Sequence, residues 1–187
     1  MVKLFKLLRI NKLANIWVIS DTHFMHEGVL RFKNYLGEPM RVFDDVYHMG
    51  EHLVERWNSV VKPEDKVFHL GDVALKDKGI EYIGRCNGHK RLLLGNHDYP
   101  NMRLYQPYFE KIYSTRLLDK ILFSHIPVHP LSLGKALICC HGHTHSNVPP
   151  DHFGKQYYNV SCEVLDDYTP IAFEDLKKKA FKRLESR

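Results

Sequence analysis

Short apolar runs recur along the chain, and each is bounded by glycine, aspartate, serine or asparagine. The runs span residues 16–19, 67–70, 92–94, 121–123, 136–140 and 157–160. They are rich in β-branched residues or leucine and are too short to form stable helices. We therefore expect a buried strand at each run.

Helical spacing of apolar residues appears between these runs and again near the C-terminal end. Apolar residues repeat every three or four positions across 46–60, where Asp44 or Asp45 can act as the N-cap. Residues 77–85 and 173–184 show similar spacing, and lysines occupy the polar face of the second segment. We expect a helix at each of these three segments.

Strands alternate with helices early in the chain and follow one another later. This order predicts the α/β class, with a β-sandwich of mixed sheets flanked by helices. The 187 residues contain no repeat, low-complexity segment or Ser/Gly linker, so we expect one domain spanning 1–187. No run of about eighteen apolar residues occurs, which predicts no membrane-spanning helix and no membrane partner. Residues 1–13 mix basic and apolar side chains, which favours a strand or short helix over a signal peptide.

The composition is that of a globular protein with a small excess of positive charge. The chain has 27 Lys and Arg against 22 Asp and Glu, a net charge of +5. This balance suits substrates that carry phosphate but does not indicate specific nucleic-acid binding. The four cysteines form no C-x-x-C pair, which favours a reducing cytoplasmic location.

Metal-binding residue types directly follow five of the predicted strands. They are Asp21, His23, Asp72, Asn96, His125, His143 and His145. Ligands bind beyond the carboxyl ends of strands in open α/β sheets, so we expect these side chains to converge. The D-x-H and H-x-H spacings would direct both ligands to one side if the backbone is extended. Imidazole with carboxylate and amide oxygen favours Mn²⁺, Fe, Zn²⁺, Ni²⁺ or Co²⁺ over a Mg²⁺ or Ca²⁺ cage.

The same residues form ordered motifs that resemble a known family. The motifs are Asp21-Thr22-His23, Gly71-Asp72, Gly95-Asn96-His97-Asp98, His125 and Gly142-His143-Thr144-His145. They resemble the D-x-H, GD, GNH[DE], H and GHxH motifs of the calcineurin-like metallophosphoesterases. The resemblance implies a phosphoesterase with two divalent ions, Mn²⁺ being the first choice.

The resemblance also implies a role for each matched residue. Asp21, His23 and His145 would hold the first ion, Asn96, His125 and His143 would hold the second, and Asp72 would bridge them. The ions would lie about 3.5–4 Å apart and clamp a hydroxide together with the phosphoryl oxygens.

Three residues are expected to contact the substrate. His97 would bind the phosphate and protonate the leaving oxygen, because histidine exchanges protons near neutral pH. Asn96 would contact the phosphate, and His26, on the loop after the first strand, could line the substrate site. His97 and Asp72 are therefore the predicted catalytic residues.

One departure from the family pattern bears on the substrate. Protein Ser/Thr phosphatases carry GDxxDRG after the bridging aspartate, whereas here Gly71-Asp72 is followed by Val73-Ala74-Leu75-Lys76-Asp77. Protein phosphatase activity is thus disfavoured, and the chain looks more like small uncharacterised phosphoesterases of bacteria and phages. We expect a phosphodiester or phosphomonoester substrate: a nucleotide, a nucleic-acid end or another phosphorylated small molecule.

The same sequence features also allow other functions and roles. A non-catalytic scaffold of the same fold is the alternative function, disfavoured because every ligand position and His97 are kept. Arg31 and Arg41 are candidates for phosphate contacts, although arginines on such loops are usually surface salt-bridge partners. His69 is expected in the core, and His141 beneath the ligands. The sequence does not indicate the oligomeric state.

Overall fold

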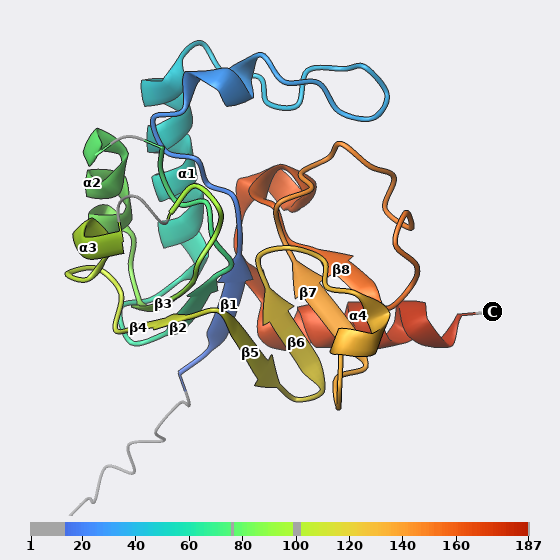
Figure 1. Cartoon of the computed structure of the whole chain (residues 1–187). Helices are drawn as coiled ribbons and strands as arrows, with labels where there is room; N and C mark the ends of the chain where they lie inside the picture. The colour runs from blue at the N-terminus through green and yellow to red at the C-terminus, as the bar shows by residue number, and fades with distance from the viewer. Residues whose placement is uncertain (1–13, 76, 99–101, 187) are drawn as a thin grey trace, which may run out of the picture.

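The computed structural model describes residues 14–75, 77–98 and 102–186. Two sheets form the centre of the protein (Figure 1). The first has the order β4-β3-β2-β1-β9 and the second β5-β6-β7-β8. The first sheet comprises β1 (Ile16–Ile19), β2 (Lys66–His69), β3 (His89–Leu93), β4 (Lys111–Tyr113) and β9 (Ile171–Ala172). The second comprises β5 (Thr115–Leu118), β6 (Ile121–Ser124), β7 (Ile138–His141) and β8 (Tyr157–Asn159).

Both sheets are mixed, as the sequence predicts. Strands β1 to β4 are parallel and only β9 runs antiparallel in the first sheet. Strands β6 to β8 are parallel and β5 is antiparallel to β6. The parallel strands bring the carboxyl ends of each sheet to one rim.

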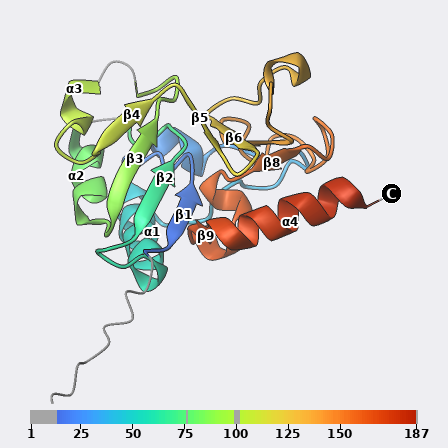
Figure 2. The ribbon, with the colours of Figure 1, turned by 90° about the horizontal axis from the view of Figure 1, so that it is seen from below.

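Four α-helices within the described residues flank the sheets. They are α1 (Val46–Val60), α2 (Asp77–Arg85), α3 (Met102–Tyr105) and α4 (Phe173–Glu185). Helices α1, α2 and α3 lie on one side of the first sheet, and α4 runs beside β9 (Figures 1 and 2). The predicted N-cap of the first helix is confirmed at Asp45, whose side chain accepts a hydrogen bond from the backbone N–H of His48. No helix of the described residues is long and apolar enough to cross a membrane.

Side chains along the central strands of the first sheet point alternately to its two faces, and this divides the core into two layers. Ile19, Val67 and Leu92 pack toward α1 and α2, with Trp57 at the centre of that layer. The residues next to them in sequence point to the opposite face and pack on the second sheet and α4. This second layer includes Val18, Phe68, Leu93, Ile121, Phe123, Ile138 and Phe173. Because successive strand residues point to opposite faces, the first sheet is buried on both sides.

The structure adds elements that the apolar pattern did not predict. β5 is largely exposed and β9 has only two residues, so neither produces an apolar run. The short helix α3 is also absent from the prediction. The expected strand or helix within 1–13 lies outside the described residues.

Candidate metal centre

The loops after the parallel strands carry the predicted ligands to a common rim. The two sheets meet there, because the backbone N–H of Ser20, after β1, donates to the carbonyl of Val160, after β8. The carbonyl of Ser20 in turn accepts from the N–H of Cys162. This pairing joins the first strand of one sheet to the last strand of the other and sets the loops side by side.

The ligand loops adopt left-handed backbone conformations. The φ angles are 58° at Asp21, 47° at His23, 56° at Asp72, 65° at His143 and 49° at His145. The expectation that D-x-H and H-x-H lie on extended backbone is therefore wrong. Such φ values are costly for residues other than glycine and are typical of functional sites that the surrounding fold holds in place.

Two groups of metal-ligand side chains form at this rim. The first contains Asp21, His23 and His145, and all three are buried. The Oδ1 atom of Asp21 lies 3.9 Å from Nε2 of His23 and 3.8 Å from Nε2 of His145. Three nitrogen and oxygen donors at this spacing could hold one divalent ion.

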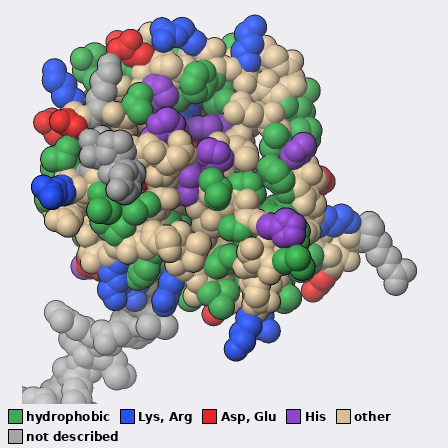
Figure 3. All heavy atoms as spheres, viewed as in Figure 1, with side chains coloured by type: hydrophobic (Ala, Val, Ile, Leu, Met, Phe, Trp, Pro, Cys, Tyr) green, Lys and Arg blue, Asp and Glu red, His purple; other side chains and the backbone are tan. Residues whose placement is uncertain are grey.

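The second group contains Asp72, His125 and His143. Asn96 lies beside it, with its amide oxygen 3.0 Å from Nε2 of His125. Asn96 and His143 are exposed, whereas Asp72 and His125 are buried, so this group opens to solvent. Figure 3 shows histidine side chains gathered on this face of the molecule.

Asp72 lies between the two groups. Its Oδ2 atom is 3.6 Å from Nε2 of His23 in the first group and 3.5 Å from Nε2 of His125 in the second. Asp72 therefore faces one histidine of each group.

Hydrogen bonds on the far side of the imidazoles direct Nε2 toward the groups. Nδ1 of His125 lies 2.8 Å from the carbonyl oxygen of Leu70, and Nδ1 of His145 lies 2.6 Å from Oε1 of Glu163. These acceptors place the proton on Nδ1 and leave Nε2 as a ligand atom. Nδ1 of His23 lies 3.2 Å from Nδ1 of His26, which therefore contacts a ligand directly.

Burial and neighbouring charges shift the pKa values of the side chains in both groups. Burial raises the pKa of Asp21 and lowers that of His23 well below its ordinary value. Burial opposes the charged form of His125, yet the hydrogen bond and charge of Asp72, together with the charge of Asp21, raise its pKa to about 9. Nε2 of His23 is buried and has no hydrogen-bond partner among the described residues. Because an unpaired buried nitrogen is costly, a cation bound there would satisfy it, and the residues present fit a metal.

His97 lies next to the groups but belongs to neither. Its backbone N–H donates to Oδ1 of Asp72 at 3.0 Å. Its half-buried ring meets that of His23 edge-on, with 5.6 Å between centroids, and lies 6.3 Å from the ring of His26. The side chain is therefore free to contact a substrate at the rim.

Two glycines allow the loops to approach closely. A Cβ at Gly95 would lie 2.2 Å from Oδ1 of Asp72, and one at Gly142 would lie 2.2 Å from Oδ2 of Asp21. Any side chain at these positions would displace a carboxylate of one group.

Several residues that support the groups were missed by the sequence analysis. Asp98 accepts hydrogen bonds from the backbone N–H groups of Asp72, Val73 and Gly95, which fixes the loop after β2. It is the last residue of the Gly95-Asn96-His97-Asp98 motif, to which the sequence analysis assigned no role, so its position was a usable signal. Glu163 lies in a short 3-10 helix, Cys162–Val164, outside every motif, and the sequence gives no sign of its role.

Arg41 forms an ion pair, as arginines on such loops usually do, but the pair is buried and not at the surface. Arg41 is buried and donates to the carbonyls of Asp21 and Thr22 and to Oε2 of Glu163. It therefore supports the backbone of the D-x-H turn. Arg31 is exposed.

The core histidines agree with the sequence expectations. His69 is fully buried: its Nε2 lies 3.0 Å from Oγ1 of Thr22 and its Nδ1 accepts from the N–H of Gly71. His141 is buried behind the ligand loop, where burial lowers its pKa to about 4.

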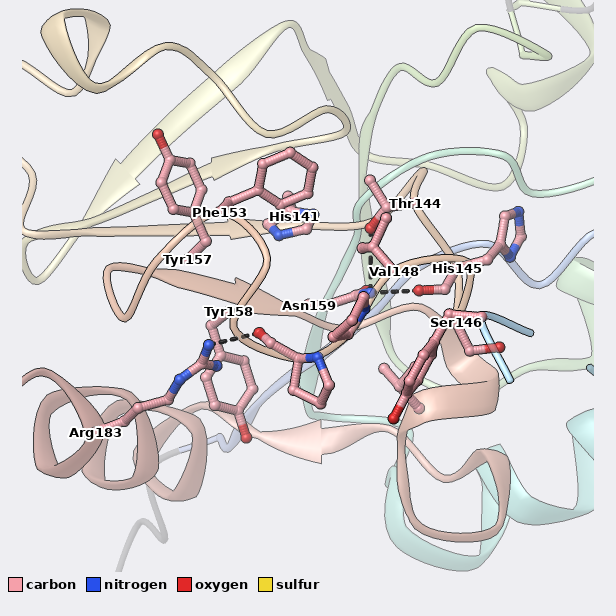
Figure 4. A pocket seen from close by; sticks show the side chains of 14 residues that line it. His141, Thr144, His145, Ser146, Val148, Phe153, Tyr157, Tyr158, Asn159 and Arg183 are labelled. Carbon is pink, nitrogen blue, oxygen red and sulfur yellow. Dashed lines mark hydrogen bonds between the residues drawn. The ribbon is translucent and has the colours of Figure 1, made fainter. Parts of the chain in front are cut away.

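A separate cavity of about 240 Å³ lies behind the 144–146 loop. Phe153, Tyr157 and Tyr158 line it, and the ring of His145 points away from it toward the metal-ligand groups (Figure 4). The amide of Asn159 spans the loop, donating to Thr144 Oγ1 and to the carbonyl of His145. The loop thus separates this cavity from the metal-ligand groups.

Paired histidine–aspartate groups on a two-sheet α/β scaffold define a class of metal-dependent hydrolases. Comparison with known proteins identifies the family: the chain belongs to the calcineurin-like phosphoesterases, whose family profile matches residues 14–183. It is therefore a metal-dependent phosphoester hydrolase.

The individual relatives are similar in size. An uncharacterized protein of Methanocaldococcus jannaschii is 30% identical over 178 residues, covering 89% of this chain and 91% of the relative. The gene 66 protein of Mycobacterium phage D29 is 29% identical over 170 residues, covering 73% of this chain and 81% of the relative. The crystal structure of a protein of unknown function from Aquifex aeolicus matches with a TM-score of 0.69 at 25% identity. The match covers 89% of this chain and 99% of the Aquifex chain.

Proposed function

We propose that the protein hydrolyses a phosphodiester or phosphomonoester of a nucleotide or nucleic-acid end at a centre of two divalent ions. The observation that carries this proposal is the place of Asp72 Oδ2, between His23 of one group and His125 of the other. Two groups that share one carboxylate are suited to a pair of ions that act together on one phosphate.

Seven side chains would hold the ions. Asp21, His23 and His145 would hold the first, Asn96, His125 and His143 the second, and Asp72 both. Mixed nitrogen and oxygen donors favour Mn²⁺, with Fe, Zn²⁺, Ni²⁺ and Co²⁺ as alternatives. When bound, the ions would supply positive charge to the phosphoryl oxygens and make water a stronger nucleophile.

The other residues at the rim act on the substrate or on the ligands. His97, whose ring lies beside those of His23 and His26, protonates the oxygen of the leaving group. The exposed Asn96 is also within reach of the phosphate. His26 contacts Nδ1 of His23, so its first role is to orient that ligand, and substrate contact is its second.

The proposal is tested by measuring the rate at which the Mn²⁺-loaded protein hydrolyses a simple aryl phosphodiester and an aryl phosphomonoester. We expect turnover of at least one ester, loss of turnover in Asp72→Asn, and no change in the matched variant Asp119→Asn, which alters an exposed aspartate paired with Lys177. An inert Mn²⁺-loaded protein across both esters would instead favour the non-catalytic scaffold.

A further inference from the structure

An apolar cavity of about 420 Å³ opens beside the second metal-ligand group. Asn96 and His125 are among the residues that line it, and Leu94, Ile126 and Val128 supply its apolar walls. A molecule whose phosphate sits at the metal centre would therefore meet this cavity directly.

The wall formed by residues 126–128 is held in place by hydrogen bonds. Oγ of Ser124 donates to the carbonyl of Ile126, and the hydroxyl of Tyr157 donates to the carbonyl of Val128, both at 2.7 Å. The Ile126 side chain nevertheless remains 50% exposed, one residue from the ligand His125. A fixed apolar side chain beside a polar reaction centre is typical of a substrate-binding wall.

An aromatic side chain lies beside the first metal-ligand group. The ring of Phe32 meets that of His26 edge-on, with 5.8 Å between centroids, and His26 in turn adjoins His23 and His97. Phe32 thus belongs to the side of the first group, whereas Ile126 belongs to the side of the second. Because His97 is the proposed acid and adjoins His26, the leaving group departs on the Phe32 side.

We propose that the apolar cavity beside Asn96 and His125 binds the ester substituent that stays on the phosphate, which makes the protein a phosphodiesterase in preference to a phosphomonoesterase. The inference rests on the proposed function. The oxygen of water bonds to phosphorus and water releases one proton to solvent, while the bond from phosphorus to the leaving oxygen breaks and that oxygen takes a proton from protonated His97, which regains a proton from solvent. The products are an alcohol and a phosphomonoester whose organic group remains in the cavity. A monoester substrate has no second organic group and would leave the cavity without a partner.

The first test compares two substrates that release the same 4-nitrophenolate, bis(4-nitrophenyl) phosphate and 4-nitrophenyl phosphate. With Mn²⁺, we expect a higher kcat/KM for the diester. Ile126→Ala should lower kcat/KM for the diester about tenfold and change that of the monoester less than about twofold. In the orientation that leads to hydrolysis only the diester places a group against Ile126, because the single aryl group of the monoester is then the leaving group, and non-productive binding does not alter kcat/KM. Phe32→Ala should lower both alike. Leu137→Ala is the matched control, because Leu137 is 47% exposed but does not line this cavity, and neither substrate should be affected.

Equal losses for both esters in Ile126→Ala, or a preference for the monoester, would overturn the inference while leaving hydrolysis established. A second measurement does not depend on turnover: calorimetric titration of the Mn²⁺-loaded protein with phenyl phosphate and with inorganic phosphate. We expect phenyl phosphate to bind about tenfold more tightly, and Ile126→Ala to remove that difference. Equal affinities of the wild type for phenyl phosphate and inorganic phosphate would overturn the inference, whether or not the protein hydrolyses either ester. Absence of hydrolysis of both esters would instead contradict the proposed function.

Discussion

Glu163 holds the imidazole of His145 in a fixed orientation, with its Oε1 atom 2.6 Å from Nδ1 of the ring. The other carboxylate oxygen accepts a hydrogen bond from Arg41 at 2.7 Å. Arg41 also donates to the carbonyls of Asp21 and Thr22. One buried ion pair therefore connects two proposed ligands of the first ion, Asp21 through its backbone and His145 through its ring.

This relationship predicts the effect of Glu163→Gln. The glutamine amide lacks the negative charge of the Glu163 carboxylate, which favours an N–H on Nδ1 of His145. The NH₂ group of the amide would also face either that N–H or Arg41. We expect Mn²⁺ affinity at the first group to fall roughly 10–100-fold, the range for partners that orient metal ligands. Calorimetric Mn²⁺ titration measures this effect, with Glu174→Gln on the exposed face of α4 as the control. Unchanged affinity in Glu163→Gln would show that the pair does not orient His145 for a metal.

His97→Ala separates metal binding from turnover. His97 is in neither ligand group, so its loss should leave the Mn²⁺ content unchanged. Turnover should fall roughly 10²–10⁴-fold, the contribution typical of a positioned general acid. The loss should be smaller for an ester with an acidic leaving alcohol, which needs less protonation. Loss of bound Mn²⁺ in parallel with activity would identify His97 as a ligand instead.

His69 makes the stability of the metal-free protein depend on pH. Complete burial lowers the pKa of His69 to about 3, whereas an unfolded histidine titrates at about 6.5. Above the unfolded value His69 is neutral in both states and its contribution is fully present. As the pH falls from about 6.5 toward 3, the unfolded chain takes up a proton that the folded protein excludes, and stability is lost.

The size of this effect follows from the pKa difference. Between pH 6.5 and 4.5 the loss attributable to His69 is roughly 2–3 kcal/mol. Urea denaturation in the presence of a chelator should show a flatter pH dependence for His69→Gln than for the wild type. His48→Gln, on the exposed side of α1, should keep the wild-type slope. An identical pH dependence of the unfolding free energy in all three proteins would mean that the folded protein does not prevent protonation of His69.

Much of the fold could be predicted because the ligand-bearing strands are short, apolar and buried. The apolar runs located β1, β2, β3, β6, β7 and β8 to within a few residues. The edge strands β4, β5 and β9 were missed, since their residues are partly or fully exposed and carry no apolar run. Their positions depend on pairing with strands that are already formed.

The ligand types could also be predicted, but the residues that orient them could not. Histidine and aspartate after a strand are visible locally, and the structure brings them together. Arg41 and Glu163 are 122 positions apart, so their contact exists only once the two sheets meet. The backbone of the D-x-H turn was wrongly predicted for the same reason. Its left-handed residues are held by tertiary contacts such as the N–H of His23 to the carbonyl of Asp72.

The proposed dinuclear centre requires that two ions bind at two groups that share Asp72. Measurement of Mn²⁺ bound per chain, by calorimetric titration followed by metal analysis of the dialysed protein, tests it most directly. We predict two ions per chain in the wild type, weakened binding of both ions in Asp72→Asn, and one well-bound ion in His125→Ala, which alters the second group alone. A single ion in the wild type, or two tightly held ions in Asp72→Asn, would contradict the shared dinuclear centre.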